Sequence, residues 1–317
     1  MGRGNHKPRG GSLQFWPRKR TKRIYPRIRS WVKQDALKLL GFAGYKVGMT
    51  QAIIIDNIPN SLTKGMQVSY PITVIECPPL KPFSLRLYKN TPYGLKLVTE
   101  IFTPKFDKEL SRKLSLPKKN KEKQVIESAD EIRLVVYTQP KLINLKKRPE
   151  LFEVALGGTI KEGIEYWKKI LNSEIKLKDV IKDGQFIDVH SVTKGKGFQG
   201  PIKRFGLSLK GHKSEKKKRS AGNLGPWHPA KVKFTVPQHG QMGYHTRTEY
   251  NKLVLFVGEN PEKINPKPGF NHYGFVKSDY LLVKGSVPGP TKRLIRLTEP
   301  VRQIKSLHPL EIKYIAK

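Results

Sequence analysis

Cysteine is almost absent from this chain of 317 residues, and long apolar runs are absent altogether. Cys77 is the only cysteine, which excludes a disulfide framework and a cysteine-based zinc site and indicates a reducing, cytoplasmic environment. The longest apolar runs, Leu253–Val257 and Ala52–Ile55, are far shorter than the ~20 residues that span a bilayer. The amino terminus carries charge but no apolar segment. We therefore expect no secretory signal and no membrane partner.

Acidic residues are also scarce. The chain has 62 Lys and Arg against 25 Asp and Glu, a formal net charge of +37. Self-repulsion on this scale destabilises a compact monomer unless counter-charge is supplied, and a polyphosphate supplies it. A single cationic run is usually a solvated face, but here the excess spans the whole chain. The balance therefore indicates a nucleic-acid partner.

The cations concentrate in two segments that are also rich in glycine or proline. Residues 3–33 hold eleven Lys and Arg, and the first acid is Asp35. Residues 194–250 hold thirteen Lys and Arg against Glu215 and Glu249, together with nine glycines. Such segments bury too little apolar surface to fold alone, so we expect extended arms that take their shape from RNA enclosing them.

Outside the arms the sequence predicts a mainly β protein. Short strands on both sides of a mixed α/β stretch, from about 81 to 180, favour a small β-barrel built from discontinuous pieces. The predicted strands are Tyr45–Ile55, Tyr70–Cys77, Ile132–Tyr137, Leu151–Leu156, Gln185–Val192, Lys252–Val257, Tyr280–Val287 and Arg293–Leu297. The predicted helices are Lys33–Leu40, Asp107–Leu114 and Ile160–Leu171, and Lys118–Lys123 is predicted as a charged loop.

The stretch Gly195–Gly200 satisfies the G-x-G-x-x-G pattern of dinucleotide-binding proteins. That site requires a helix directly afterwards and an acidic residue ~20 positions further on. Here Pro201 follows at once, and no apolar helical period is present. We therefore predict no cofactor, and interpret the glycines as a strand exit whose bare backbone lets phosphates approach Lys194 and Lys196.

Trp227 lies in a segment, Gly222–Pro229, whose glycines and prolines predict a tight bend. One interpretation is that this tryptophan anchors the loop to the barrel. We favour the other, in which the ring stacks on an unpaired base, an interaction worth ~1–3 kcal/mol.

The polar stretch Pro237–Glu249 superficially resembles a catalytic cluster. His239, His245 and Glu249 do not form an H-E-x-x-H metal motif, and no cysteine is near. We predict no metal and no catalytic residue here. Gln, His, Tyr and Arg side chains are better suited to contact phosphate and 2′-hydroxyl oxygens.

Five strings resemble the universal large-subunit ribosomal protein L-three family in its archaeal or eukaryote-like form. They occur in the family's order and cover both ends and the centre of the chain, whereas residues 81–180 match only in general character. The strings are Gly11–Arg20, Val192–Gly200, Gly222–Pro229, Gly243–Glu249 and Lys284–Pro290.

The resemblance implies a mainly β fold: a closed translation-protein-type β-barrel with an inserted α+β subdomain, a long amino-terminal extension and a long central loop. The expected divisions are an rRNA-penetrating extension (1–40), the first barrel segment (41–80), the inserted subdomain (81–180), the second barrel segment (181–199), the central basic loop (200–247) and the third barrel segment (248–317).

The resemblance also implies a non-catalytic structural constituent of the cytoplasmic large ribosomal subunit. Its partners would be large-subunit rRNA, near the 3′-terminal part, and neighbouring ribosomal proteins, with no small-molecule substrate. Such a protein supports early assembly and extends the loop tip (Gly225, Pro226, Trp227 and His228) toward the peptidyl transferase centre.

The density of cations, together with the polar residues of 237–249, selects the residues that we expect to bind rRNA. They are Arg9, Arg18, Lys19, Arg20, Lys22, Arg23, Arg27, Lys194, Lys196, Lys203, Arg204, Lys210, Lys213, Lys216, Lys217, Lys218, Arg219, His239, Tyr244, His245 and Arg247. Two alternatives are an RNA-modifying enzyme with basic arms and a general nucleic-acid-compacting protein.

Overall fold

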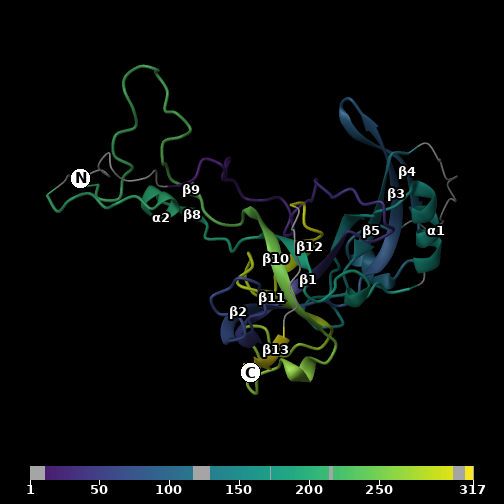
Figure 1. Cartoon of the computed structure of the whole chain (residues 1–317). Coiled ribbons are helices and arrows are strands. Elements are labelled where there is room, and N and C mark those ends of the chain that lie inside the picture. Colours follow the sequence, from purple (N-terminus) through teal and green to yellow (C-terminus); the bar gives the residue numbers. More distant parts are fainter. Residues whose placement is uncertain (1–10, 117–128, 172, 214–216, 303–310, 317) are drawn as a thin grey trace. The chain divides into compact units, whose positions relative to one another are not determined.

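The computed structural model describes residues 11–116, 129–171, 173–213, 217–302 and 311–316 (Figure 1). Packing divides the chain into two units. Unit 1 comprises Met1–Ile24 and Val192–Arg247, and unit 2 comprises Tyr25–Ser191 and Thr248–Lys317. Arg9, Lys216 and the loop Lys118–Lys123 lie outside the described residues.

The larger sheet has seven strands in the order β12-β7-β10-β11-β2-β1-β13, and β12 also pairs with β1. Its pairings are antiparallel wherever the register is defined. The strands are β1 (Gly41–Ile55), β2 (Gln67–Glu76), β7 (Phe186–Val192), β10 (Thr246–Gly258), β11 (Tyr280–Lys284), β12 (Leu294–Thr298) and β13 (Glu311–Ile315).

Aliphatic side chains from several of these strands form the core of unit 2. Ile75, Val189, Val283 and Ile295 are completely buried, and they belong to one apolar cluster. β-Branched residues favour the pleated conformation. Burying each such side chain stabilises the fold by roughly 1.5–3 kcal/mol relative to leaving it exposed. The local preference for strand and the burial of apolar area therefore act together here.

A second sheet has four strands in the order β4-β3-β5-β6. Helix α1 (Ile160–Ile170) begins at a capping box between Thr159 and Glu162 and buries Trp167. The strands are β3 (Lys81–Thr91), β4 (Gly94–Phe102), β5 (Glu131–Tyr137) and β6 (Leu151–Ala155). Three short 3-10 helices complete unit 2: η1 (Lys108–Arg112), η2 (Leu177–Asp179) and η3 (Pro261–Lys263).

The mainly β class is confirmed, and each predicted strand appears with its ends shifted by a few residues or extended. The helix predicted at Lys33–Leu40 is wrong, because main-chain groups of this segment pair elsewhere. Leu40 N–H donates to Ala155 O at 3.0 Å, and Gly157 N–H donates to Lys38 O at 2.9 Å. The helix predicted at Asp107–Leu114 is the 3-10 helix η1. The β3–β4 hairpin and β13 were not predicted from the sequence.

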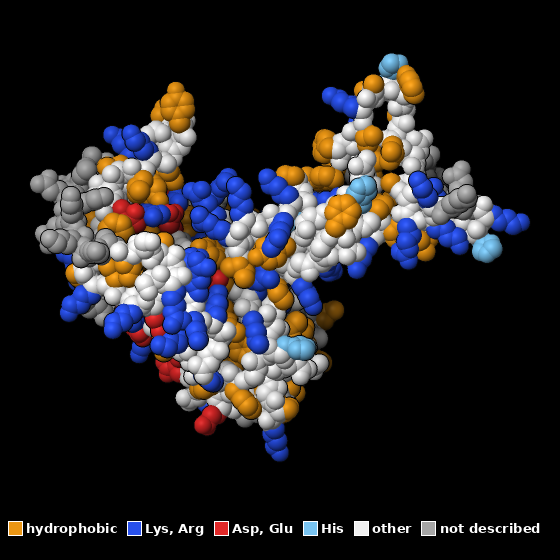
Figure 2. Space-filling view, turned by 180° about the vertical axis from the view of Figure 1, so that it is seen from behind, with side chains coloured by type: hydrophobic (Ala, Val, Ile, Leu, Met, Phe, Trp, Pro, Cys, Tyr) orange, Lys and Arg blue, Asp and Glu red, His pale blue; other side chains and the backbone are white. Residues whose placement is uncertain are grey.

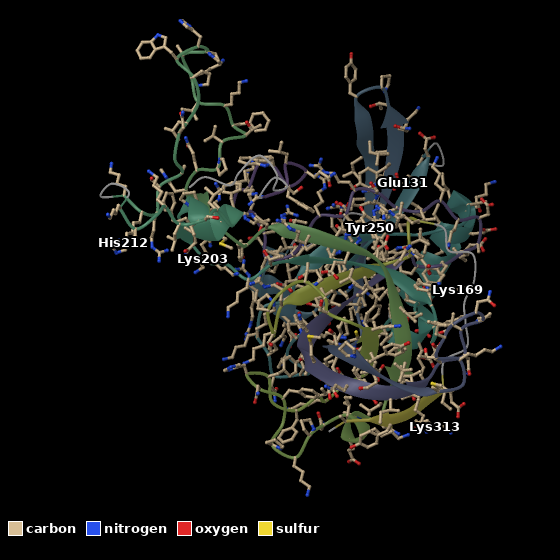
Figure 3. All side chains as sticks on the ribbon, turned by 60° about the vertical axis from the view of Figure 1, so that its left-hand side comes forward. Glu131, Lys169, Lys203, His212, Tyr250 and Lys313 are labelled. Carbon is tan, nitrogen blue, oxygen red and sulfur yellow. The ribbon has the colours of Figure 1, made fainter. Side chains whose placement is uncertain are left out.

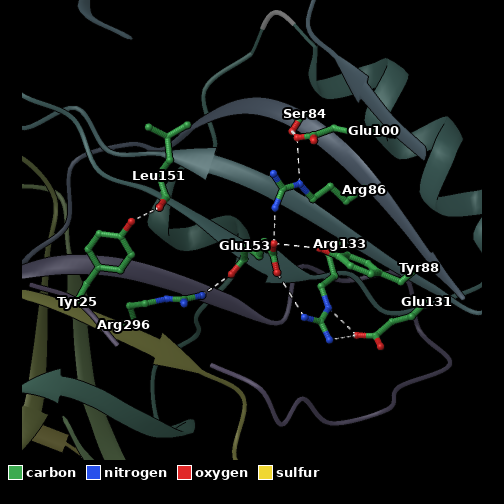
Figure 4. A network of polar contacts seen from close by, with 10 residues as sticks. All are labelled: Tyr25, Ser84, Arg86, Tyr88, Glu100, Glu131, Arg133, Leu151, Glu153 and Arg296. Atoms are coloured by element: carbon green, nitrogen blue, oxygen red, sulfur yellow. Dashed lines mark hydrogen bonds and ion pairs between the residues drawn. The ribbon is translucent and has the colours of Figure 1, made fainter. Parts of the chain in front are cut away.

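A polar network binds the beginning of unit 2 to its strands (Figure 4). The Tyr25 hydroxyl donates to Leu151 O at 2.5 Å, and the buried Arg296 donates to Pro26 O and Glu153 O. The Glu153 carboxylate in turn accepts from Arg86 and Arg133. The chain thus joins unit 2 at Tyr25, whereas the boundary at residue 40 stays a prediction.

Candidate nucleic-acid interface

Two stretches of unit 1 that are about fifty residues apart in sequence form the stem of the central loop. The short strands β8 (Phe198–Gln199) and β9 (Gly240–Gln241) pair antiparallel. Thr193 N–H donates to His245 O at 2.9 Å, which continues the stem. At Gly243 φ is +72°, and an added Cβ would lie 2.1 Å from Lys194 O. Only glycine fits this close approach of the two strands.

A short helix, α2 (Pro201–Phe205), follows β8. No helix was expected here from the sequence, and this expectation is wrong. Pro201 at the first position has its φ preset for a helix, and Gly206 ends the helix at φ +66°. The helix has only five residues, unlike the long helix that a dinucleotide fingerprint requires.

Phe205 of helix α2 is only 4% exposed and packs with Trp16 and Phe234 in an aromatic cluster. Trp16 stacks on Phe205 with ring centroids 5.8 Å apart, and Phe234 meets Trp16 edge-on at the same distance. The Arg18 guanidinium lies 4.3 Å from the Phe205 centroid. Cation–π contact of this kind holds a charge against a ring. The amino-terminal segment therefore packs on the loop within unit 1.

Main-chain carbonyls hold the arginines of this cluster. Arg18 Nη1 donates to Arg204 O at 3.0 Å, and Arg204 Nη2 donates to Arg18 O at 3.2 Å. Arg204 also donates to the carbonyls of Gln238 and Gln241, each at 3.0 Å. Carbonyl partners orient a guanidinium but leave its full positive charge in place. The sequence of unit 1 contains a single acid, Glu215.

His245 is buried and bridges the two segments of unit 1. Its Nδ1 lies 3.0 Å from Lys19 O, so this nitrogen carries the proton and donates it to the carbonyl. Burial lowers the pKa of His245, the Lys19 carbonyl opposes that shift, and the nearby Arg247 reinforces it. The ring is therefore neutral at pH 7 and positions the chain. Its predicted contact with rRNA stays a prediction.

Beside this histidine lies an open hollow of about 370 Å³. Five of the side chains that line it are cationic, and none is acidic. We name this surface the cationic hollow. Its lining residues are Arg18, Thr193, Lys194, Lys196, Arg204, Met242, Gly243, His245 and Arg247. Guanidinium and ammonium groups gathered around one concavity are suited to binding phosphate oxygens.

Most of the described residues that were predicted to bind rRNA are exposed. Figure 2 shows that Lys and Arg side chains far outnumber Asp and Glu on the face in view, and Figure 3 labels Lys203 on α2. Arg20 lies over the Tyr244 ring, 5.1 Å from its centroid, and His239 contacts Phe198. The exposed set is Lys19, Arg20, Lys22, Arg23, Arg27, Lys194, Lys196, Lys203, Lys213, Lys217, Lys218, Arg219 and His239, while Lys210 is half-buried.

The tip of the central loop is exposed to solvent. Trp227 is 88% exposed, so it is not anchored against any described part of the chain. Gly225 has φ +135° and its N–H donates to Asn223 Oδ1 at 3.0 Å, which forms the predicted bend. Gly225, Pro226, Trp227 and His228 are all exposed. This tip presents a flat aromatic face to solvent.

The rings that organise this interface were not singled out from the sequence. Trp16, Phe205 and Phe234 pack together, and Phe15 lies 4.4 Å below the Arg247 guanidinium. The signal was the adjacency of aromatic and arginine residues, as in Arg204-Phe205. The cluster joins rings from the amino-terminal segment and the central loop, so neither segment predicts it when considered alone.

Over the described ranges, no group of three or more His, Cys, Asp or Glu side chains is arranged to hold a metal ion. In the same ranges, no helix has the length and apolar content needed to cross a membrane.

Comparison with known proteins finds similarity over almost the full length of the chain. A family model described as Ribosomal protein L3 matches residues 1–316. The chain is 50% identical to the large ribosomal subunit protein uL3 of Archaeoglobus fulgidus, covering 95% of this chain and 94% of that one. The proteins of the same name from Methanobrevibacter smithii and Methanothermobacter thermautotrophicus are 45% and 44% identical, each over 98% of this chain and 97% of its own length.

Proposed function

Because this chain belongs to the ribosomal protein L3 family, we propose that it is a structural protein of the large ribosomal subunit in the cytoplasm and binds large-subunit rRNA. The family resemblance that the five sequence strings predicted is confirmed. The proposal assigns the chain no catalytic role, no cofactor and no small-molecule substrate. Its partners are rRNA and the neighbouring proteins of the subunit.

The cationic hollow is the observation that carries rRNA binding. Arg18, Lys194, Lys196, Arg204 and Arg247 line it with no acidic side chain among them. Two of the guanidinium groups are already oriented by carbonyls, so less conformational entropy is lost when a phosphate binds. Each neutralised phosphate releases condensed counterions, which favours binding further.

We extend the proposal to the architecture of unit 2, as a closed β-barrel of the translation-protein type. The strand order β12-β7-β10-β11-β2-β1 and the additional pairing of β12 with β1 support it. Gly41 lies opposite Thr298 and Tyr45 opposite Leu294 in that pairing. The second sheet and α1 would then be the inserted α+β subdomain.

We also propose that the exposed loop tip reaches toward the peptidyl transferase centre, and that the protein supports early assembly near the 3′-terminal part of the large rRNA. The exposure of Trp227 and the absence of packing around it among the described residues support a role for its ring outside this chain. Trp227→Ala is then expected to disturb accommodation of aminoacyl-tRNA more than subunit assembly. Poor assembly together with normal accommodation in the assembled ribosomes would contradict this.

The double variant Lys194→Gln/Lys196→Gln tests the proposed rRNA binding. Both side chains are exposed and line the cationic hollow, so their removal leaves the packing of unit 1 intact. The slope of log affinity for rRNA against log salt concentration is expected to become shallower by roughly 1.5, because two phosphate contacts are lost. Lys313→Gln, on β13 beside Glu311, is the control and should leave the slope unchanged.

The same titrations separate the alternative functions. A general nucleic-acid-compacting protein would bind duplex DNA and rRNA with similar affinity and salt slope. An RNA-modifying enzyme would bind a nucleotide cofactor in direct titration. An unchanged salt slope in the double variant would reject the cationic hollow as an rRNA contact.

A further inference from the structure

A β-hairpin in unit 2 projects from the rest of the four-stranded sheet (Figure 1). Strands β3 and β4 form it, and β4 is an edge strand whose partner among the described strands is β3. At the turn, Thr91 Oγ1 donates to Gly94 O at 2.6 Å, and Gly94 has φ +110°, a conformation that favours glycine. At the base, Arg86 pairs with Glu100 and Glu153 (Figure 4). The hairpin is thus fixed at its base and closed at its tip.

Two lysines near the tip face each other across the hairpin. Lys89 lies directly opposite Lys96 in the antiparallel register. Like charges in this position destabilise a strand pair. In the part of the chain that the structure describes, neither lysine forms a salt bridge. Asp130, directly before β5, accepts a hydrogen bond through its carboxylate from the main-chain N–H of Asn90 at 2.7 Å.

The turn itself carries a fully exposed aromatic side chain, Tyr93, between Pro92 and Gly94. Alternation along the strands separates the lysines from the partly exposed Leu95 and Leu97, which lie on the opposite face. One face of the tip is therefore cationic, and a flat ring stands at its end. A phosphate with its own base fits this combination, because the anion neutralises the lysine pair and any base can stack on the ring.

We infer that the tip of the β3–β4 hairpin is a second RNA-binding site, at which a single-stranded rRNA phosphate lies between Lys89 and Lys96 and a base stacks on Tyr93. This inference rests on the proposed function, since it requires rRNA as the partner. Charge complementarity decides for RNA over a protein: the tip segment 89–96 carries two cations and no acid. A protein docked on the two leucines is the competing outcome.

The first test compares full-length variants in binding to large-subunit rRNA. Tyr93→Ala should weaken binding on the order of tenfold, while Tyr93→Phe should keep it, because stacking needs the ring and not the hydroxyl. Lys89→Gln/Lys96→Gln should make the salt slope shallower by roughly 0.7, because one single-stranded phosphate contact is lost. Leu95→Ser, on the opposite face, is the matched control and should change neither quantity. The side chains at 93 and 95 are exposed, so their variants should unfold at the same denaturant concentration as the natural chain. The Lys89/Lys96 variant removes a like-charge pair, so it should unfold at the same or a higher concentration.

The second test locates the contact by hydroxyl-radical footprinting of the rRNA and by a photocrosslinking side chain at position 93. Loss of one discrete footprint in the Lys89/Lys96 variant, with a crosslink from position 93 to RNA, supports the inference. Footprints identical to those of the natural chain, or a crosslink to a protein, overturn it and leave the proposed function intact. If the natural chain itself protects no rRNA, the proposed function fails and the inference fails with it.

Discussion

In unit 2, aliphatic side chains from different strands, such as Ile75 and Val283, fill a continuous interior, whereas in unit 1 the buried ring of Phe205 lies between Trp16 and two guanidinium groups. Charge separates the units as well. Unit 1 carries 21 Lys and Arg and a single acid in 80 residues, while the remaining 237 residues carry 41 and 24. Aliphatic side chains thus form the core of unit 2, whereas aromatic rings and arginines pack together in unit 1.

The difference shows how a chain so rich in cations folds and still binds a polyanion. In unit 2, Arg86 and Arg133 both have a carboxylate partner in Glu153. In unit 1, Arg18 and Arg204 use carbonyls and aromatic rings, which orient them but cancel no charge. A region packed in this way keeps its charge available for a ligand.

The largest effect is expected from removing the buried arginine of unit 2. Arg296→Ala leaves the carbonyls of Pro26 and Glu153 without their donor and removes packing against Phe152. The free energy of unfolding should fall by about 3–5 kcal/mol, measured by urea denaturation. Arg302→Ala, at an exposed position over Tyr250, is the control and should cost less than about 1 kcal/mol. Equal losses in both variants would refute the special role of Arg296.

Phe205→Ala is the corresponding change in unit 1. It removes the ring that Trp16, Arg18 and Arg204 all contact, at a cost of about 3–4 kcal/mol. The loss should be local: proteolysis within 192–247 should accelerate while the urea midpoint of unit 2 stays constant. Phe198→Ala, on the same stem but exposed, is the matched control and should leave the cleavage rate unchanged. A shifted midpoint of unit 2 would show that the two units do not pack independently.

A pH titration sharpens the comparison, because each unit holds a histidine with a lowered pKa. Burial, reinforced by the charge of Arg296, lowers the pKa of His190 to about 4. Between pH 6.5 and pH 4 the unfolded chain binds a proton that the folded chain does not. Stability is therefore present above pH 6.5 and is lost as the pH falls toward 4, by roughly 2–3 kcal/mol.

The check is the free energy of unfolding of the natural chain and of His190→Gln at pH 7 and pH 4.5. The variant lacks the titrating ring, so its stability should fall less over this interval. In the folded chain the two ring nitrogens contact Thr248 and Thr298 at 2.9 and 3.0 Å. The same pH dependence in both proteins would mean that His190 titrates normally.

The sequence predicted the strands of the large sheet other than β13, because short runs rich in β-branched residues favour strand. It missed the β3–β4 hairpin because most of β4 is exposed and its polar residues do not alternate cleanly with apolar ones. The helix predicted at Lys33–Leu40 failed for a tertiary reason, since Leu40 pairs its main chain with Ala155. The local sequence favoured a helix there, but the main-chain pairing with a distant segment prevented it.

At the candidate interface, the sequence predicted the cations and the exposed Trp227 but not the arrangement of the rings. Trp16 and Phe205 meet although they are 189 positions apart, and no local pattern encodes that pairing. The glycines of the stem were predicted to provide backbone freedom. The close approach of Gly243 to Lys194 O became visible only in the structure.

Gly243→Ala probes this stem with a smaller expected effect. The added Cβ would meet Lys194 O at 2.1 Å in a left-handed conformation, and the backbone strain alone should cost about 1–3 kcal/mol. Hydrogen exchange at the amides of Lys196 and Met242, which pair across the stem, should accelerate accordingly. Gly200→Ala is the matched control, because open space surrounds that glycine and its φ of −72° is ordinary. Unchanged exchange rates in Gly243→Ala would show that the stem accommodates the added Cβ without losing stability.

The smallest effect on stability is expected at the loop tip, where the comparison between the units is sharpest. Because Trp227 is 88% exposed, Trp227→Ala should change the free energy of unfolding by less than about 0.5 kcal/mol. Trp167→Ala, in the core of unit 2, should cost about 3–5 kcal/mol by the same measurement. A loss of 1 kcal/mol or more at Trp227 would mean that its ring packs within this chain. The two tryptophans are the same side chain, so the contrast between them isolates what packing contributes and leaves the ring of Trp227 for a partner outside the chain.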